Sequence, residues 1–187
     1  MSSARTTRPL SGQFYRRDLV NRLNACRQVP LTLLMAPAGS GKSTLLSQWL
    51  QQAAEQPVVS MAIQPSDDDP VRFLRRFAEQ TRAVVPAFDT SWFMPFDVSE
   101  LPPSSIAEAL HDALEQVSGP LYIVFDDFQH IRNAETLNVL DQMCASPPGD
   151  VHLIIASRTR PGLNLSLLRL KDNLLELDAG SLRVNRE

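Results

Sequence analysis

The sequence predicts an α/β fold in which a mostly parallel sheet lies between two layers of helices. Two observations support this prediction. Short apolar segments that suit buried strands alternate along the chain with segments whose apolar residues recur at helical spacing. The first of these strands, at residues 31–35, also leads through a small glycine-containing loop into a helical segment. We expect an N-terminal arm at residues 1–13 and one folded domain at residues 14–187.

The composition is that of an ordinary globular protein. Hydrophobic residues make up 43% of the 187 residues, and the formal net charge of −3 gives no support for nucleic-acid binding by this segment. No apolar stretch approaches the ~20 residues that span a membrane, and the start lacks the apolar core of a secretory signal, so we expect a cytoplasmic protein without membrane contacts. Cys26 and Cys144 stand far apart in apolar surroundings, where they could be reduced packing residues or form a disulfide.

The first half of the domain is expected to begin with two strands. A short helix ends before Pro30, and the strand at residues 31–35 follows it. A helix at residues 43–54 then leads to a second buried strand at residues 57–63.

Three aspartates at positions 67–69 stand before Pro70. Acidic residues favour the positive end of a helix and proline suits its first turn, so we expect an aspartate to cap a helix that begins here. The cluster could instead bind a metal ion, but capping accounts for it without a ligand. Apolar residues recur along residues 71–81 at a spacing of three to four, which agrees with a helix.

Residues 86–103 form a long irregular segment that holds Phe88, Trp92, Phe93 and Phe96. These rings could mark a partner surface or dock on the domain. We favour docking, because the burial of aromatic rings stabilises a fold.

The second half of the domain is expected to complete the sheet. Ser105 and Glu108 have the spacing of a capping box and predict a helix that ends at Gly119. The elements expected after it are a buried strand at 121–125, a helix at 133–144, a strand at 151–156 and a short closing strand at 174–177.

The loop after the first strand carries a P-loop motif. Gly39 and Gly41 let the backbone turn so that several N–H groups face one point, and the next helix directs its positive end there. Lys42 can reach the outer phosphates of a nucleotide, and Ser43 can offer a hydroxyl to Mg²⁺. Ala36 replaces the usual first glycine, which the loop should tolerate because alanine is small. The residues expected to contact the nucleotide are Ala36, Pro37, Ala38, Gly39, Ser40, Gly41, Lys42, Ser43 and Thr44.

A second motif follows the strand at residues 121–125, which leads into Asp126 and Asp127. Beside a P-loop this pair indicates a Walker B element, in which Asp126 holds Mg²⁺ opposite Ser43 and Asp127 polarises an attacking water as general base. One of the pair could instead cap the following turn. The pair lies far downstream of Lys42, which indicates that at least one strand is inserted in the sheet between the two motif-bearing strands.

Arg158 follows the fourth strand directly. In a parallel sheet that strand end lies beside the P-loop, so the guanidinium could sense the γ-phosphate. It could equally be a surface arginine that pairs with Asp126 or Asp127. The candidate catalytic residues are therefore Lys42, Asp127 and Arg158.

ATP is the expected nucleotide, because the sequence contains no Asn-Lys-x-Asp guanine signature. The base pocket is expected ahead of the first strand, at Pro9, Phe14, Tyr15 and Arg16. No zinc site is expected, since the histidines lack Cys or His partners at metal-ligand spacing.

With these residues in view, the chain resembles the nucleotide-binding domain of MalT-like regulators. These are large ATP-binding LuxR-type transcription activators in the STAND class of signalling NTPases. The resemblance implies a three-layer P-loop NTPase fold of the AAA/STAND-like type. It is carried by residues 8–9, 14–23, 31–49, 69–73, 121–128, 153–161 and 174–183.

Two positions depart from the family pattern. Relatives often have an acidic residue at the end of the second strand, where this chain has residues 61–64, Met-Ala-Ile-Gln. Relatives also often place a histidine after the aromatic residue that follows the acidic pair. Here Phe128 is followed by Gln129 and only then by His130, which leaves a polar sensor role there without its usual residue.

The resemblance implies a switch, in which ATP favours an active, self-associating form and hydrolysis resets it. In the family, winged-helix, helical-repeat sensor and helix-turn-helix domains follow this module, so we expect an N-terminal portion of a larger regulator whose DNA contacts lie elsewhere. The alternatives are a stand-alone small ATPase, a small-molecule kinase or a non-hydrolysing binding module. A kinase would need a lid with arginines, and the lid candidate at residues 86–103 contains none.

Overall fold

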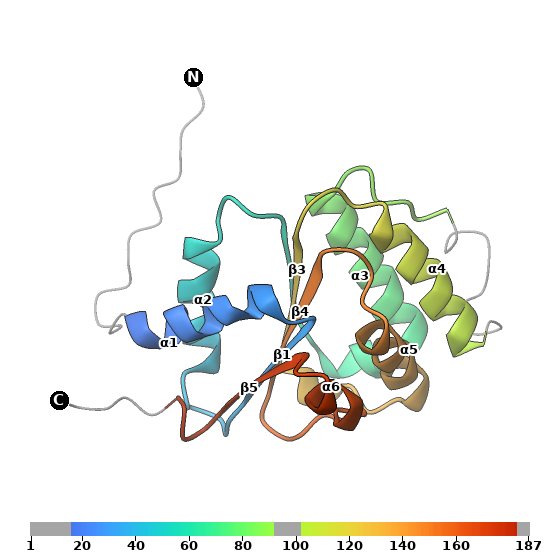
Figure 1. The fold of residues 1–187 in the computed structure, drawn as a ribbon. Coiled ribbons are helices and arrows are strands. Elements are labelled where there is room, and N and C mark those ends of the chain that lie inside the picture. The colour runs from blue at the N-terminus through green and yellow to red at the C-terminus, as the bar shows by residue number, and fades with distance from the viewer. Residues whose placement is uncertain (1–15, 92–101, 183–187) are drawn as a thin grey trace.

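The computed structural model of the chain describes residues 16–91 and 102–182 (Figure 1). Within these residues, five parallel strands form one sheet in the order β2-β3-β4-β1-β5. The strands are β1 Leu31–Met35, β2 Val58–Ala62, β3 Leu121–Asp126, β4 Val151–Ser157 and β5 Leu174–Asp178. β4 pairs with both β1 and β3, which confirms the predicted insertion of a strand between the two motif-bearing strands.

Helices cover both faces of this sheet, as the predicted three-layer fold requires (Figure 1). α1 and α2 pack on one face, and α3, α4, α5 and α6 pack on the other. The helices are α1 Arg17–Leu23, α2 Lys42–Gln52, α3 Pro70–Val84, α4 Pro103–Glu115, α5 Ala134–Ala145 and α6 Ser166–Leu170. Short 3₁₀ helices cover Asn24–Gln28, Pro65–Asp68 and Phe128–His130. The five-residue α6 was not predicted, because it is too short to show a helical period.

Two hydrophobic cores, one on each face, hold the three layers together. Along β3, Ile123 and Phe125 belong to the core beneath α3, α4 and α5, whereas Tyr122 and Val124 belong to the core beneath α1 and α2. This alternation is the period-two geometry of a strand that is covered on both sides. Each large side chain buried in this way stabilises the fold by roughly 1.5–3 kcal/mol.

The two cysteines lie in different cores and are free thiols. Burial raises the pKa of Cys26 to about 12 and that of Cys144 to about 12. Both are therefore protonated packing residues at neutral pH, which is the first of the two predicted alternatives.

The predicted capping box at Ser105 and Glu108 is wrong. α4 begins two residues earlier, at Pro103, and the carbonyl of Pro102 accepts the backbone N–H of Ser105 at 3.0 Å. Proline fixes the φ that a first helical turn needs, so the Pro-Pro pair sets the start and leaves Ser105 inside the helix. The helix also ends at Glu115, before Gly119.

The aspartates after β2 confirm the predicted cap and add a buried ion pair. Asp69 is the N-cap of α3, where its carboxylate accepts the backbone N–H of Arg72 at 2.8 Å. Asp67 is fully buried, accepts the backbone N–H of Gln64 at 2.8 Å and pairs with Arg76. Capping by Asp69 and pairing by Asp67 thus fix the turn between β2 and α3.

Asp68 connects the same turn to the start of α5. Its Oδ1 accepts the backbone N–H groups of Arg132 and Asn133 at 2.6 and 2.7 Å. Asn133 in turn caps α5, because its Oδ1 accepts the backbone N–H of Glu135 at 2.8 Å. The loop after β2 and the loop after β3 are therefore joined by charge-assisted hydrogen bonds.

Phe88 docks on the domain, as predicted for the aromatic residues of its segment. It is buried, and its ring lies edge-on to Phe77 with 6.5 Å between the ring centroids. Trp92, Phe93 and Phe96 lie outside the described residues. None of the described helices combines the length and the apolar character needed to cross a membrane.

Candidate functional site

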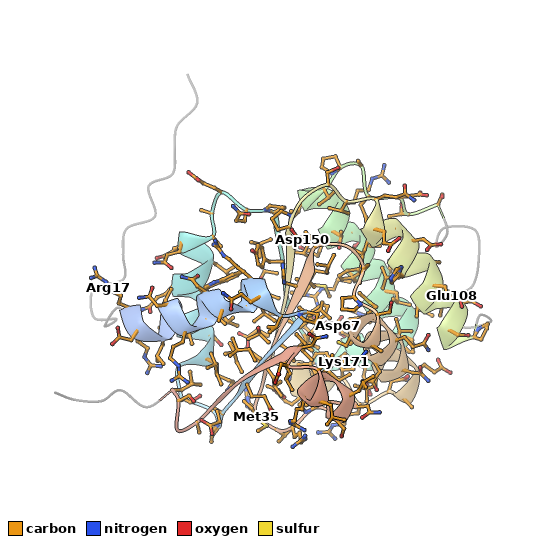
Figure 2. The ribbon with its side chains drawn as sticks, in the orientation of Figure 1. Arg17, Met35, Asp67, Glu108, Asp150 and Lys171 are labelled. Carbon is orange, nitrogen blue, oxygen red and sulfur yellow. The ribbon has the colours of Figure 1, made fainter. Side chains whose placement is uncertain are left out.

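The carboxyl ends of β1, β3 and β4 lie at one edge of the sheet, which Met35 marks in Figure 2, with Asp150 at the opposite edge. Met35 pairs with Ser157 in the register of β1 and β4. The backbone N–H of Ala36, the first residue of the P-loop, donates to the carbonyl of Ser157 at 3.2 Å. The sheet therefore brings the P-loop beside the ends of β3 and β4, as the sequence predicts.

The P-loop adopts the backbone turns that its glycines predict. Gly39 has a φ of 76° and Gly41 a φ of 85°, both in the left-handed region. Gly41 caps α2, which begins at Lys42 rather than at Ser43. Ala36 has no positive φ and is buried, so alanine is accommodated at the first position of the loop. These turns and the start of α2 directly after them are what the predicted anion site requires.

Lys42 lies inside the loop. Its side chain is buried, and its Nζ donates to the carbonyls of Ala36 and Pro37, at 3.0 Å in the second case. Burial lowers the pKa of Lys42, whereas the nearby charges of Asp126 and Asp127 raise it. The ammonium group is thus bonded within the P-loop and lies close enough to the acidic pair to be affected by its charges.

Asp126 accepts a hydrogen bond from the backbone N–H of Asp127 at 2.8 Å, as a turn-capping aspartate does. Asp127 itself has a φ of 55°, a left-handed conformation that costs a non-glycine residue about 1–2 kcal/mol. The side chains of Asp126, Asp127 and Ser43 are all at least partly accessible at this edge. The pair therefore leaves β3 through a strained turn, and both carboxylates lie close enough to Lys42 for their charges to act on its pKa.

Asp127 is held by two side chains. Its Oδ1 accepts a hydrogen bond from Gln129 Nε2 at 2.8 Å and another from Arg158 Nη2 at 3.3 Å. The hydrogen bond from Gln129 is the main cause that lowers the pKa of Asp127, and the charge of Arg158 lowers it further. Asp127 is therefore ionised at neutral pH, and the predicted pairing of Arg158 with the acidic pair is present.

Arg16 lies on the P-loop. Its backbone N–H donates to Gln48 Oε1 at 3.1 Å, and its Nη1 donates to the carbonyl of Ser40 at 3.3 Å. A Cβ atom added to Gly41 would come within 2.8 Å of Arg16 Nη1, so the guanidinium packs directly on this glycine. The other residues expected in the base pocket, Pro9, Phe14 and Tyr15, lie outside the described residues.

Sequence reasoning missed three polar residues at this edge. Gln129 bridges Asp127 and the end of β4, and Gln48 is buried where it accepts the Arg16 N–H. Ser157 is fully buried at the end of β4, and within the described residues its hydroxyl has no hydrogen-bond partner. No local pattern identifies Gln48 or Ser157, whereas Gln129 was noted only as a departure from the family pattern and was given no role in the site.

Comparison with known proteins relates the chain to one family. A sequence profile described as an AAA ATPase domain matches residues 14–156. The chain is 30% identical over 182 residues to the HTH-type transcriptional regulator MalT of Yersinia enterocolitica, and 30% identical over 180 residues to that of Yersinia pestis. These matches cover 95% and 94% of this chain but only 20% and 19% of the relatives. The chain thus spans about a fifth of the length of the curated relatives it matches.

Solved structures with the same fold include a Walker-type ATPase of Pyrococcus abyssi, with a TM-score of 0.57 and 16% identity over 89% of this chain and 54% of that one. A structure of Drosophila ORC bound to AT-rich DNA and Cdc6 also has a TM-score of 0.57, with 13% identity over 88% of this chain and 53% of that one. At these identities the likeness concerns the fold alone.

Proposed function

The chain belongs to the AAA ATPase domain family, and from this premise we propose that it binds Mg·ATP as the nucleotide switch of a MalT-like transcription regulator. The observation that carries the proposal is the position of Lys42, whose buried ammonium lies inside a P-loop and within the electrostatic reach of Asp126, Asp127 and Arg158. In this proposal residues 14–187 form the nucleotide domain, residues 1–13 an arm, and the protein is cytoplasmic.

The residues at this edge fit a nucleoside triphosphate. The two left-handed glycines, Gly39 and Gly41, give the loop its concave turn, and the buried hydroxyl of Ser40 has no hydrogen-bond partner within the described residues. The ammonium group of Lys42 donates to carbonyls of its own loop. It can therefore donate to phosphate oxygens instead, without being left as an unpaired buried charge. Loop N–H groups, Ser40 and Lys42 would therefore hold the phosphates, with Arg16 close to the loop.

The residue types also suit Mg²⁺, because Ser43 offers an exposed hydroxyl at the start of α2 and Asp126 a partly exposed carboxylate at the end of β3. Hydroxyl and carboxylate oxygens are the ligands that Mg²⁺ prefers beside phosphates. When bound, the ion would neutralise phosphate charge. Asp127 would accept a hydrogen bond from an attacking water and orient it, and Arg158 could exchange Asp127 for a γ-phosphate oxygen.

We propose that hydrolysis is slow in this domain alone. A carboxylate with a lowered pKa takes up a proton weakly, and Oδ1 of Asp127 already accepts hydrogen bonds from Gln129 and Arg158. Asp127 is therefore better suited to orienting water than to abstracting its proton. Neighbouring domains or a second copy would complete the site, and DNA contacts would be made outside this segment, whose net charge is −3.

Thermal unfolding at increasing concentrations of Mg·ATP tests this function. A ligand present at ~1,000 times its Kd stabilises the folded protein by about 4 kcal/mol, so a clear rise of Tm is expected. Lys42→Ala should remove the rise. Lys171→Ala is the matched control, because Lys171 is exposed at the end of α6, and it should respond like the parent. A parent that shows no rise, or a Lys42→Ala variant that rises equally, would contradict the proposal.

A further inference from the structure

Gln129 lies in the loop after β3 and bonds both to that loop and to the loop after β4. Its Nε2 donates to Asp127 Oδ1 at 2.8 Å, and its Oε1 accepts the backbone N–H of Arg158 at 3.1 Å. The Arg158 side chain closes the triangle, because its Nη2 donates to the same Asp127 oxygen at 3.3 Å. One amide thus joins the end of β3 to the end of β4.

The orientation of this amide is determined by its partners. A backbone N–H can only donate, so the oxygen of Gln129 must face Arg158. An ionised carboxylate can only accept, so the NH₂ group must face Asp127. Few side chains offer a donor and an acceptor a suitable distance apart, which makes Gln129 hard to replace by an apolar residue of similar length.

The backbone around Gln129 is firmly anchored. Phe128 is fully buried and Ile131 is 4% exposed, so both ends of the short 3₁₀ helix are fixed in the core. The N–H of Ile131 donates to the carbonyl of Phe128 at 3.0 Å, and the N–H of His130 to that of Asp127 at 3.3 Å. Because the backbone of Gln129 is anchored, its side-chain amide can restrain Asp127 in its left-handed conformation.

We infer that Gln129 is a positioning residue that holds the Asp127 carboxylate and the backbone of Arg158 as one unit at the nucleotide edge. The inference rests on the proposed nucleotide function. If the Arg158 guanidinium leaves Asp127 for a phosphate, the Gln129 bridge still keeps both residues in place, because it binds the Arg158 backbone and not its side chain. Asp127 then stays aligned while Arg158 reports the presence of the γ-phosphate.

Three substitutions separate the two bonds of the bridge. Gln129→Met keeps the length of the side chain and removes both bonds. Gln129→Glu keeps an acceptor for the Arg158 N–H but turns a second carboxylate toward Asp127. Gln129→His, in its neutral form, again offers one donor and one acceptor and serves as the rescue variant. Gln142→Met is the matched control, since Gln142 makes a similar bond, to Asn138 at 2.7 Å, on the outside of α5.

The first measurement is hydrogen exchange of the Arg158 amide without nucleotide, which does not depend on the proposed function. Exchange should become about tenfold faster in Gln129→Met and stay near the parent rate in Gln129→Glu, because only the second keeps the acceptor. The second measurement is the ratio of ATP to ADP affinity. We expect Gln129→Met and Gln129→Glu to lower it about fivefold, the effect of one lost hydrogen bond, with Gln129→His intermediate and ADP affinity unchanged.

Unchanged exchange and an unchanged affinity ratio in Gln129→Met would overturn the inference, as would equal changes in Gln142→Met. A parent that does not bind ATP through Lys42 would overturn the proposed function instead, and the exchange of the Arg158 amide would still decide whether Gln129 holds the end of β4.

Discussion

The P-loop and the side-chain cluster of Asp127, Gln129 and Arg158 lie at the same edge of the sheet, but they are built differently. The P-loop is one continuous segment that offers backbone N–H groups, and its shape depends on two left-handed glycines. The side-chain cluster is assembled from two loops, because Asp127 and Gln129 after β3 bond to Arg158 after β4, about thirty positions away. The difference teaches that the shape of the P-loop depends on the backbone conformation of two glycines, whereas the second site depends on each of its side-chain partners.

The largest effect is expected where the backbone of the P-loop is changed. Gly41→Ala should cost about 2 kcal/mol of unfolding free energy and remove the Tm response to Mg·ATP. Alanine disfavours the positive φ of this position, and its Cβ would clash with the Arg16 guanidinium. Gly39→Ala is the matched comparison, since it has a similar φ but nothing within 4 Å of the added atom. Chemical denaturation of both variants measures the difference. Equal costs at the two glycines would show that Arg16 does not restrict the loop.

Asp127→Asn should act on turnover and leave stability almost unchanged. Asparagine keeps the acceptor for Gln129 and tolerates the left-handed conformation, so the unfolding free energy should stay within about 0.5 kcal/mol of the parent. Phosphate release should fall roughly tenfold, because a neutral amide orients the attacking water by about 1–1.5 kcal/mol less than a carboxylate does, and ADP affinity should be unchanged. Asp172→Asn is the control, because Asp172 has the same left-handed φ far from the acidic pair in sequence. Full turnover in Asp127→Asn would assign the catalytic role to another group.

Arg16→Ala should weaken Mg·ATP binding about fivefold, because it removes one hydrogen bond that fixes the P-loop at Ser40. It should also reduce the penalty of Gly41→Ala by roughly 0.5–1 kcal/mol, since the two residues are in contact and their effects do not add. A double-mutant cycle on the unfolding free energy measures this coupling, and the exposed neighbour Arg17→Ala is the control. Strict additivity would contradict the packing of Arg16 on the loop.

The smallest effect is expected for the ion pair between Asp127 and Arg158. Their side chains are 39% and 51% exposed, so a cycle with Asp127→Asn and Arg158→Gln should give a coupling below ~1 kcal/mol. Because the folded pKa of Asp127 is lowered, this contribution is present above the ordinary aspartate pKa and is lost as the pH falls through the lower folded value. The coupling should therefore be measurable at neutral pH and vanish in strong acid. A coupling that grows on acidification would contradict the assignment.

The fold was predictable because its signals are local. Each of the five strands is a short apolar run, and the P-loop motif is complete within nine residues. The start of α4 was predicted wrongly, because the Ser105 and Glu108 pattern was given more weight than the Pro-Pro pair that stands before it. At this position the preference of Ser105 for an N-cap conflicts with the preference of proline for a first helical turn. The fixed φ of proline determines where α4 begins.

The candidate site was predictable only in part. The residues of the P-loop and the acidic pair could be named, because each set is contiguous in sequence. The Gln129 bridge and the contact of Arg16 with Gly41 could not, since each joins residues more than twenty positions apart that meet only after the sheet has formed. Whether Arg158 pairs with a carboxylate also depends on that meeting. The structure shows this pairing with Asp127, and the sensing of a γ-phosphate by Arg158 stays a prediction.

The free cysteines provide a built-in pair of reporters. Cys26 is buried beside α1 and α2, and Cys144 is buried in the core on the other side of the sheet. A thiol reagent can reach each one only when its own layer opens, so the two labelling rates record the opening of the two layers separately. Because the P-loop continues into α2, bound nucleotide should slow the labelling of Cys26 more than that of Cys144.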